Sequence, residues 1–150
     1  MMLSKKQVRA IYDHCRSAYP KEAVGVVLGS EGSDAQDRIV PCDNALDELH
    51  DPDPQQHRRA AEVGFAIAPD RLLDLDAECR AKGWRMKLIY HSHPDGDMQL
   101  SPADRSHALA HDGTPLHPRV TYMVVAVEAG AVVGHALHRW DAERRDFVAL

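Results

Sequence analysis

The sequence predicts a single α/β (α+β) domain in which helices pack on one mixed β-sheet. Helical and strand patterns alternate through most of the chain, and three strand patterns follow one another at its end. A length of 150 residues suits one compact domain, and 44% hydrophobic with 27% charged residues is typical of a globular chain. No repeat or linker divides the sequence, so we predict one domain over residues 1–150.

The first third of the chain predicts one helix and two strands. From Ser4 to Ala18 apolar residues recur at helical spacing, with Ser4 as the N-cap and Pro20 beyond the end. The continuous apolar run "AVGVVLGS", residues 23–30, predicts a buried strand. The next strand is predicted at "DRIVPC", residues 37–42.

A polar segment from Asp43 to Gly64 predicts a long loop. It contains two prolines and shows neither helical nor strand periodicity. Long loops in compact domains are often functional, and a surface insertion without a function is an equally open interpretation.

The segment "FAIAPDRLLDLDAECRAKGW" predicts a short extended piece followed by a helix that ends at Gly83. The apolar face of this helix is predicted from Leu72, Leu73, Leu75, Ala77 and Cys79.

The rest of the chain predicts a strand, a helix and three final strands. "MKLIYHSH" reads as a strand, and a helix is expected from Ser101 to about His111. The final strands are predicted at residues 119–127, 131–140 and 147–150, joined by two short turns.

Composition excludes several classes of function. A net charge of -5 argues against nucleic acid as a partner, because affinity for phosphates requires a basic surface. The three cysteines, Cys15, Cys42 and Cys79, form no CxxC pair, so they predict free thiols rather than a disulfide framework or a structural zinc site. No run is apolar enough for a signal peptide or a membrane span, so we expect a cytoplasmic protein without a membrane partner.

The stretch "HSHPDGDMQLSPAD", residues 91–104, carries the chemistry of the chain. In a strand, side chains alternate between faces, so His91 and His93 point the same way and Ser92 points away. Imidazole binds zinc at about 2.0–2.1 Å, and a catalytic zinc takes three protein ligands and a water. Asp104 is the candidate for the third ligand.

The residues between the histidines and Asp104 predict a reversal of the chain. Pro94 ends the strand, Gly96 permits a sharp turn, and "SPAD" predicts a helix that starts with Ser101 as its N-cap. That helix start brings Asp104 back toward the end of the strand. An HxH pair or a Ser-x-x-Asp cap is common without a metal, but their combination in one short window favours a metal site.

Other polar residues in this region are weaker candidates. Asp95 and Asp97 suit a tight turn through hydrogen bonds to the main chain, so we do not assign them as ligands. His107 and His111 follow Asp104 on the same side of the predicted helix, and we expect both to lie on the surface.

Taken together, these residues resemble the signature of the JAMM zinc metallopeptidases, also called the MPN-plus or Mov34 family: His-x-His, seven residues, Ser, two residues, Asp. That family also places a glutamate upstream, and Glu22 in "YPKEAVGVVLG" occupies the matching position. "FAIAPDRLL" and "CDNA" are similar to further segments of the family. The resemblance implies a curved mixed sheet with helices, similar to the cytidine-deaminase fold.

The resemblance also implies a role for each residue of the set. His91, His93 and Asp104 would bind Zn²⁺. Glu22 would act as general base and then as proton donor to the leaving amine. Ser101 would donate a hydrogen bond to the oxyanion while its oxygen caps the helix, which the donor and acceptor capacity of a hydroxyl allows.

For short bacterial members, the resemblance implies cleavage of a peptide or isopeptide bond after the C-terminal glycine of a ubiquitin-like or sulfur-carrier protein. Such a tail is extended and would bind by β-strand addition, in a groove flanked by the Asp43–Gly64 loop and the Asp95–Leu100 turn.

Three alternatives stand beside this hypothesis. Some relatives lack the metal residues and serve as binding scaffolds, whereas this chain keeps all five. A nucleoside deaminase would need His-x-Glu and Cys-x-x-Cys ligands, which are missing here. The "HPDGD" turn also resembles that of the RadC-type domain, associated by name with DNA repair, which the acidic balance disfavours.

Overall fold

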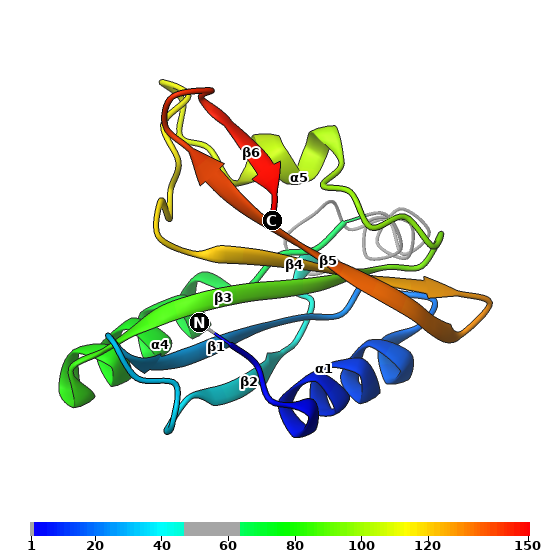
Figure 1. Ribbon diagram of the computed structural model, residues 1–150, viewed down its shortest axis with the longest axis horizontal. Helices are drawn as coiled ribbons and strands as arrows, with labels where there is room; N and C mark the ends of the chain where they lie inside the picture. The colour runs from blue at the N-terminus through cyan, green and yellow to red at the C-terminus, as the bar shows by residue number, and fades with distance from the viewer. Residues whose placement is uncertain (1, 47–63) are drawn as a thin grey trace.

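The computed structural model describes residues 2–46 and 64–150, which form one six-stranded sheet with helices on both faces (Figure 1). The elements are α1 (Lys5–Ala18), β1 (Val24–Ser30), β2 (Arg38–Cys42), α4 (Pro69–Lys82), β3 (Trp84–His93), α5 (Pro102–His107), β4 (Thr121–Glu128), β5 (Ala131–Asp141) and β6 (Asp146–Ala149).

The sheet is mixed, as the sequence predicts. Its strand order is β2-β1-β3-β4-β5-β6. The pair β3 and β4 is parallel, and the other neighbouring pairs are antiparallel. Because parallel strands need a crossover connection, the chain leaves β3, passes through α5 and returns to start β4. This crossover carries the second half of the candidate site.

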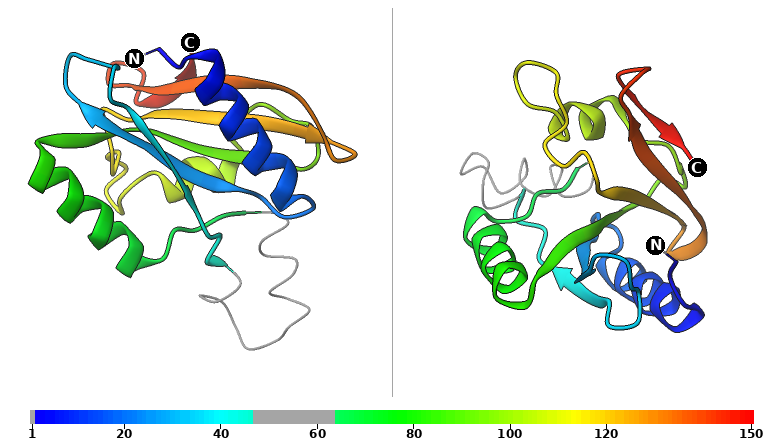
Figure 2. Two further views of the ribbon diagram at one scale, coloured as in Figure 1. Left: turned by 90° about the horizontal axis from the view of Figure 1, so that it is seen from below. Right: turned by 60° about the vertical axis from the view of Figure 1, so that its left-hand side comes forward.

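Helices cover the two faces of the sheet unequally. α1 lies on one face, and α4 and α5 lie on the other (Figure 2). Ile11 and Cys15 of α1 pack into one hydrophobic core, whereas Leu75 and Cys79 of α4 pack into the second. The central strands are therefore buried on both sides, which explains the continuous apolar run of β1.

Local signals define the ends of the two longer helices. Ser4 Oγ accepts a hydrogen bond from Gln7 N, and Gln7 Oε1 accepts one from Ser4 N, so the predicted N-cap is confirmed as a capping box. Pro69 stands at the start of α4, and Gly83 closes it at φ 67°, a left-handed conformation that favours glycine.

Two details of the sequence interpretation are wrong. The helix predicted from Ser101 to about His111 ends at His107, because Leu109 forms a β-bridge with Pro115 and the chain turns back on itself. Of the residues assigned to the apolar face of α4, Leu72 and Leu73 are exposed by 37% and 65%, and Ala77 is also exposed, so that only Leu75 and Cys79 are buried. Most of the predicted Asp43–Gly64 loop lies outside the described residues.

The three cysteines are buried free thiols, as the sequence predicts. Burial raises the pKa of the Cys15 thiol to about 12, so this thiol is unreactive at neutral pH. Within residues 2–46 and 64–150, no helix combines the length and apolarity that a membrane crossing requires.

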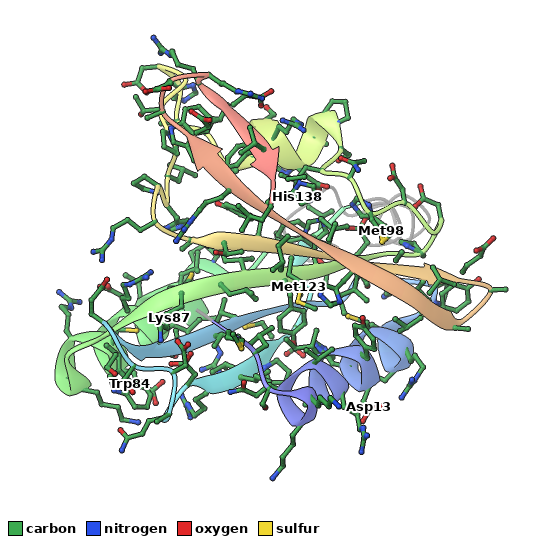
Figure 3. All side chains as sticks on the ribbon, viewed as in Figure 1. Asp13, Trp84, Lys87, Met98, Met123 and His138 are labelled. Atoms are coloured by element: carbon green, nitrogen blue, oxygen red, sulfur yellow. The ribbon has the colours of Figure 1, made fainter. Side chains whose placement is uncertain are left out.

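A partly buried ion-pair network ties the β1–β2 connection to the sheet. Lys87 of β3, labelled in Figure 3, lies 2.7 Å from Asp37 Oδ1 and 2.9 Å from Asp34 Oδ1 through its Nζ atom. Lys87 and the Asp37 side chain are nearly inaccessible to solvent. The network secures the end of β3 that lies away from the histidines.

Gly25 of β1 allows a close approach of the Tyr90 ring. A Cβ atom at Gly25 would lie 2.3 Å from the ring, well inside van der Waals contact. We therefore expect Gly25→Ala to destabilise the fold by about 3 kcal/mol, the upper part of the range for overpacked cores. Chemical denaturation would measure this loss. Tyr90→Leu, which removes the ring, should reduce the effect of Gly25→Ala, and an undiminished loss would contradict the proposed clash.

Candidate metal centre

The C-terminal end of β3 presents two histidines on one face of the sheet. His91 and His93 point to the side of α5, whereas Ser92 points to the opposite face, as strand alternation predicts. Val24 of β1 pairs with His91, so Glu22, two residues before Val24, lies beside the histidines. Glu22, His91, His93 and Asp104 are all buried, and one ligand atom from each lies within 4.8 Å of all the others.

Three of these atoms form a small triangle. His91 Nε2 lies 3.1 Å from His93 Nε2 and 3.1 Å from Asp104 Oδ2, and His93 Nε2 lies 2.9 Å from Asp104 Oδ2. Ligands at about 2.0–2.1 Å from a tetrahedral zinc lie ~3.3 Å apart. The triangle therefore needs to open by only a few tenths of an ångström, and its donor set of two imidazoles and one carboxylate suits zinc.

Asp104 is held in place by the start of α5. Ser101 Oγ accepts from Asp104 N at 3.0 Å, and Asp104 Oδ2 accepts from Ser101 N at 2.9 Å, which together form a capping box. The oxygen that completes the cap is the same oxygen that faces both histidines. The cap therefore fixes the third vertex of the triangle through the chain's own hydrogen bonds.

Neighbouring groups orient the two imidazoles. His93 Nδ1–H donates to the carbonyl oxygen of Asp97 at 3.1 Å, which leaves Nε2 free of a proton and directed into the triangle. His91 stacks on the Phe65 ring with centroids 4.3 Å apart. Both rings are thus held in the orientation that a metal ligand requires.

Glu22 faces the triangle from the segment that precedes β1. Its Oε1 is buried and has no hydrogen-bond partner in the described part of the chain. Burial raises the pKa of Glu22 from an ordinary 4.5 to about 8, with Asp104 and Asp95 adding to the effect and His93 opposing it. A cation at the triangle would satisfy this carboxyl group.

The charges within the triangle are strongly coupled. Burial alone would raise the pKa of Asp104, but its hydrogen bonds with His91 and His93 outweigh burial and hold that pKa far below its ordinary range. Burial lowers the pKa of His91. It also acts to lower the pKa of His93, but the Asp104 carboxylate prevails and raises it. Protons therefore compete for the position that a metal would take.

Comparison with known proteins decides the family. The model of the prokaryotic homologs of the JAB domain matches residues 4–144. The chain belongs to this family. The JAMM resemblance and the mixed-sheet fold expected from the sequence are thereby confirmed. A comparison with curated protein sequences gives no significant match.

Solved structures of similar fold support the architecture of this JAB domain. A protein from Desulfitobacterium hafniense matches with a TM-score of 0.66 and 23% identity, covering 98% of this chain and 87% of that one. A protein from Salinibacter ruber matches with a TM-score of 0.65 and 24% identity, covering 100% and 88%. A weaker likeness, with a TM-score of 0.48 and 15% identity over 95% and 90%, extends to a JAB1/MPN domain protein from Archaeoglobus fulgidus.

The turn after β3 is anchored to β5 in this JAB domain. His138 of β5 donates through Nε2 to the carbonyl oxygen of Met98 at 3.0 Å, and both residues are labelled in Figure 3. Asp95 and Asp97 accept hydrogen bonds from main-chain N–H groups two residues ahead, at Asp97 and Gln99, so they shape the turn as the sequence predicts. Neither belongs to the metal-type cluster found among the described residues.

A cavity of about 400 Å³ borders two of the predicted ligands, His91 and Asp104. Its wall is mainly apolar and includes Phe65, Leu100 and Tyr122. His107 also lines it and is exposed, and His111 is exposed as predicted. The JAB domain therefore offers apolar surface directly beside the candidate metal centre.

The structure brings Glu22, His91, His93 and Asp104 together and places Ser101 at the start of α5, but the sequence did not predict several residues that contact this group. Phe65 and His138 reach the site or its neighbours from other parts of the chain, and Ser92, between the two histidines on β3, accepts from Ala23 N. No local pattern marks these contacts. Asn44 was noted only as part of the "CDNA" segment. It is the single asparagine of the chain and lies two residues after the end of β2, a combination that could have drawn attention to it.

Proposed function

We propose that this JAB domain is a zinc-dependent hydrolase that cleaves a peptide or isopeptide bond after the C-terminal glycine of a ubiquitin-like or sulfur-carrier protein. The supporting observation is the buried set of His91, His93, Asp104 and Glu22, which lies within 4.8 Å and contains a triangle of the size that a zinc ion needs.

In this proposal, His91, His93 and Asp104 hold the ion. A bound zinc would polarise the scissile carbonyl and bring the pKa of a water molecule from 15.7 to about 7. These three side chains would need to move by only a few tenths of an ångström, because the strand and the capping box already hold them near the required positions.

Glu22 supplies the base. Its buried carboxyl group faces the triangle, within reach of a water molecule placed between it and the ion. Glu22 accepts the proton from the attacking water and returns it to the nitrogen of the leaving group. A partnerless carboxylate oxygen suits this task, since no existing hydrogen bond has to break first.

Ser101 stabilises the oxygen on which negative charge develops. Its Oγ accepts from Asp104 N at 3.0 Å, so the hydroxyl proton is available to donate outward. Loss of one such donor typically lowers kcat by about 10²–10³-fold.

Access to the centre and its chemistry support the proposed substrate class. All four groups of the centre are buried, so a substrate must reach them as a thin extended chain. A glycine-terminated tail meets this need, because glycine has no side chain to clash with the walls. The folded body of a carrier protein would remain outside, and its tail would lie beside the Asp95–Leu100 turn in the manner of an added strand.

Incubation with a sulfur-carrier protein that bears a cysteine on its C-terminal glycine tests the proposal. With zinc present, we expect release of the cysteine and a carrier ending in glycine, detected by mass spectrometry. A chelator should stop the reaction. Absence of cleavage for this adduct and for a panel of ubiquitin-like fusions would reject the substrate class.

A further inference from the structure

We propose that Asn44 is a positioning residue for Glu22, and that it acts together with Ser92 by holding the peptide group between Glu22 and Ala23. This inference rests on the proposed role of Glu22 as the general base. It concerns how the carboxyl group is aimed, which the family signature does not specify.

One oxygen of the Glu22 carboxyl group is not oriented by any hydrogen bond from the described residues. Its Oε1 has no hydrogen-bond partner in residues 2–46 and 64–150, and it lies in a buried position. The main chain to which this side chain is attached therefore has a large part in setting its direction. Glu22 precedes β1, so the regular pairing of β1 with β3, which begins at Val24, does not include it.

Side chains hold both polar atoms of the peptide group that follows Glu22. Asn44 Nδ2 donates to the carbonyl oxygen of Glu22 at 3.0 Å. The N–H of Ala23, in the same peptide plane, donates to Ser92 Oγ at 2.8 Å. Ser92 N also donates to the carbonyl oxygen of Ala23 at 3.1 Å. Fixing this plane at both ends fixes the direction in which the Glu22 side chain leaves the backbone.

Asn44 is suited to this task because its own amide group is fully used. Nδ2 also donates to Gly64 O at 3.0 Å, and Oδ1 accepts from Leu46 N at 3.1 Å and from Ala66 N at 3.2 Å. Two donors and two acceptors are all that an amide side chain offers. The side chain therefore cannot rotate without losing several hydrogen bonds at once.

The Asn44 amide group also holds the segment Gly64–Ala66, on the other side of the site from Glu22. Gly64 and Ala66, which it holds, flank Phe65, the ring that stacks on His91. Asn44 thus sets the distance between the segment carrying the base and the segment that packs on a predicted metal ligand. No other side chain in the described part of the chain is bonded to both segments in this way.

The informative substitution is Asn44→Asp. It keeps the oxygen that accepts from Leu46 and Ala66 but replaces the donor to Glu22 with a second acceptor, which repels the carbonyl. We expect zinc content to stay at the wild-type level, KM to change little, and kcat to fall by about 10²-fold, the size of effect that a misplacement of about 1 Å produces. The paired swap Asp43→Asn/Asn44→Asp keeps net charge and composition and should behave like Asn44→Asp, whereas Asp43→Asn alone should behave like wild type.

A double-mutant cycle separates aiming from general support of the fold. In the Glu22→Gln background the base is already gone, so adding Asn44→Asp should lower kcat no further. Equal losses in both backgrounds would overturn the proposal. Ser92→Ala removes the hydrogen bond at the other end of the same peptide group. It should lower kcat when Glu22 is present but not in the Glu22→Gln background, and it replaces Asn44→Asp in the test if that variant does not fold.

A readout without turnover keeps this test independent of the proposed function. In crystal structures of the zinc-loaded proteins, we expect the Glu22 carboxyl group to be displaced in Asn44→Asp while His91, His93 and Asp104 stay in place. An unmoved carboxyl group would refute the role of Asn44. If wild type cleaves no carrier protein, the proposed function fails, and these structures still decide whether Asn44 positions Glu22.

Discussion

Purified His91→Ala protein is expected to contain almost no zinc, whereas wild type should contain about one equivalent per chain. His91 supplies one vertex of the triangle, and the remaining imidazole and carboxylate are one ligand short of the three protein ligands that a catalytic zinc takes. Activity should fall to the level of chelated wild type. Elemental analysis alongside a cleavage assay measures both effects.

A matched control distinguishes loss of a ligand from loss of an imidazole. His135 lies on the α1 face, where Tyr12 OH is 2.6 Å from its Nδ1, and it is remote from the triangle. His135→Ala should keep its zinc. Stoichiometric zinc in His91→Ala, with circular dichroism showing a folded chain, would exclude the triangle as the metal site.

Glu22→Gln is expected to keep its zinc and to lose about 10²–10⁴-fold in kcat, the usual contribution of a general base. The wild-type activity should decline at low pH as Glu22 becomes protonated. The midpoint of that decline should lie below the metal-free pKa of about 8, because a bound cation lowers the pKa of a nearby carboxyl group. A pH profile of kcat/KM would show this acidic decline in wild type and not in the variant.

Glu22→Gln, which lowers activity, should raise the stability of the metal-free protein. Burial raises the pKa of Glu22 to about 8 in the folded chain, so between pH 4.5 and 8 the unfolded chain binds fewer protons and stability falls as pH rises. Glutamine avoids this penalty. At pH 7 metal-free Glu22→Gln should be more stable than wild type by about 2–3 kcal/mol in denaturant titrations. A less stable variant would contradict the cost of burying the Glu22 charge, and a variant with full activity would contradict its role as general base. If Glu22→Gln left the cellular function of the protein intact, a binding-scaffold role would be favoured instead.

The sequence was informative where the site depends on local geometry. Strand alternation placed His91 and His93 on one face, and the Ser-x-x-Asp pattern placed Asp104 at a helix start. Both features arise within a few residues, so the sequence alone predicts them. Glu22 was different, because its place beside the histidines depends on the pairing of β1 with β3, and only the family resemblance brought it into the set.

Long-range contacts account for what the sequence did not predict. Asn44, Phe65 and His138 act through partners 20 to 40 residues away. Lys87 lies buried in β3 because Asp34 and Asp37, which precede β2, pair with its ammonium group. Leu72 and Leu73 remain exposed although their spacing suits a buried face, since apolar spacing does not determine how much of a helix its neighbours cover.

The double use of Asp104 affects when the ion can enter. Oδ2 closes the first turn of α5 and also faces both imidazoles, so this vertex is in place as soon as the chain has folded. When the zinc ion binds, it would exchange its water ligands for side-chain ligands that are already in place. Binding of the ion would then not require the chain to fold. A chelator should accordingly remove activity without unfolding the chain, and readdition of zinc should restore activity without a refolding step.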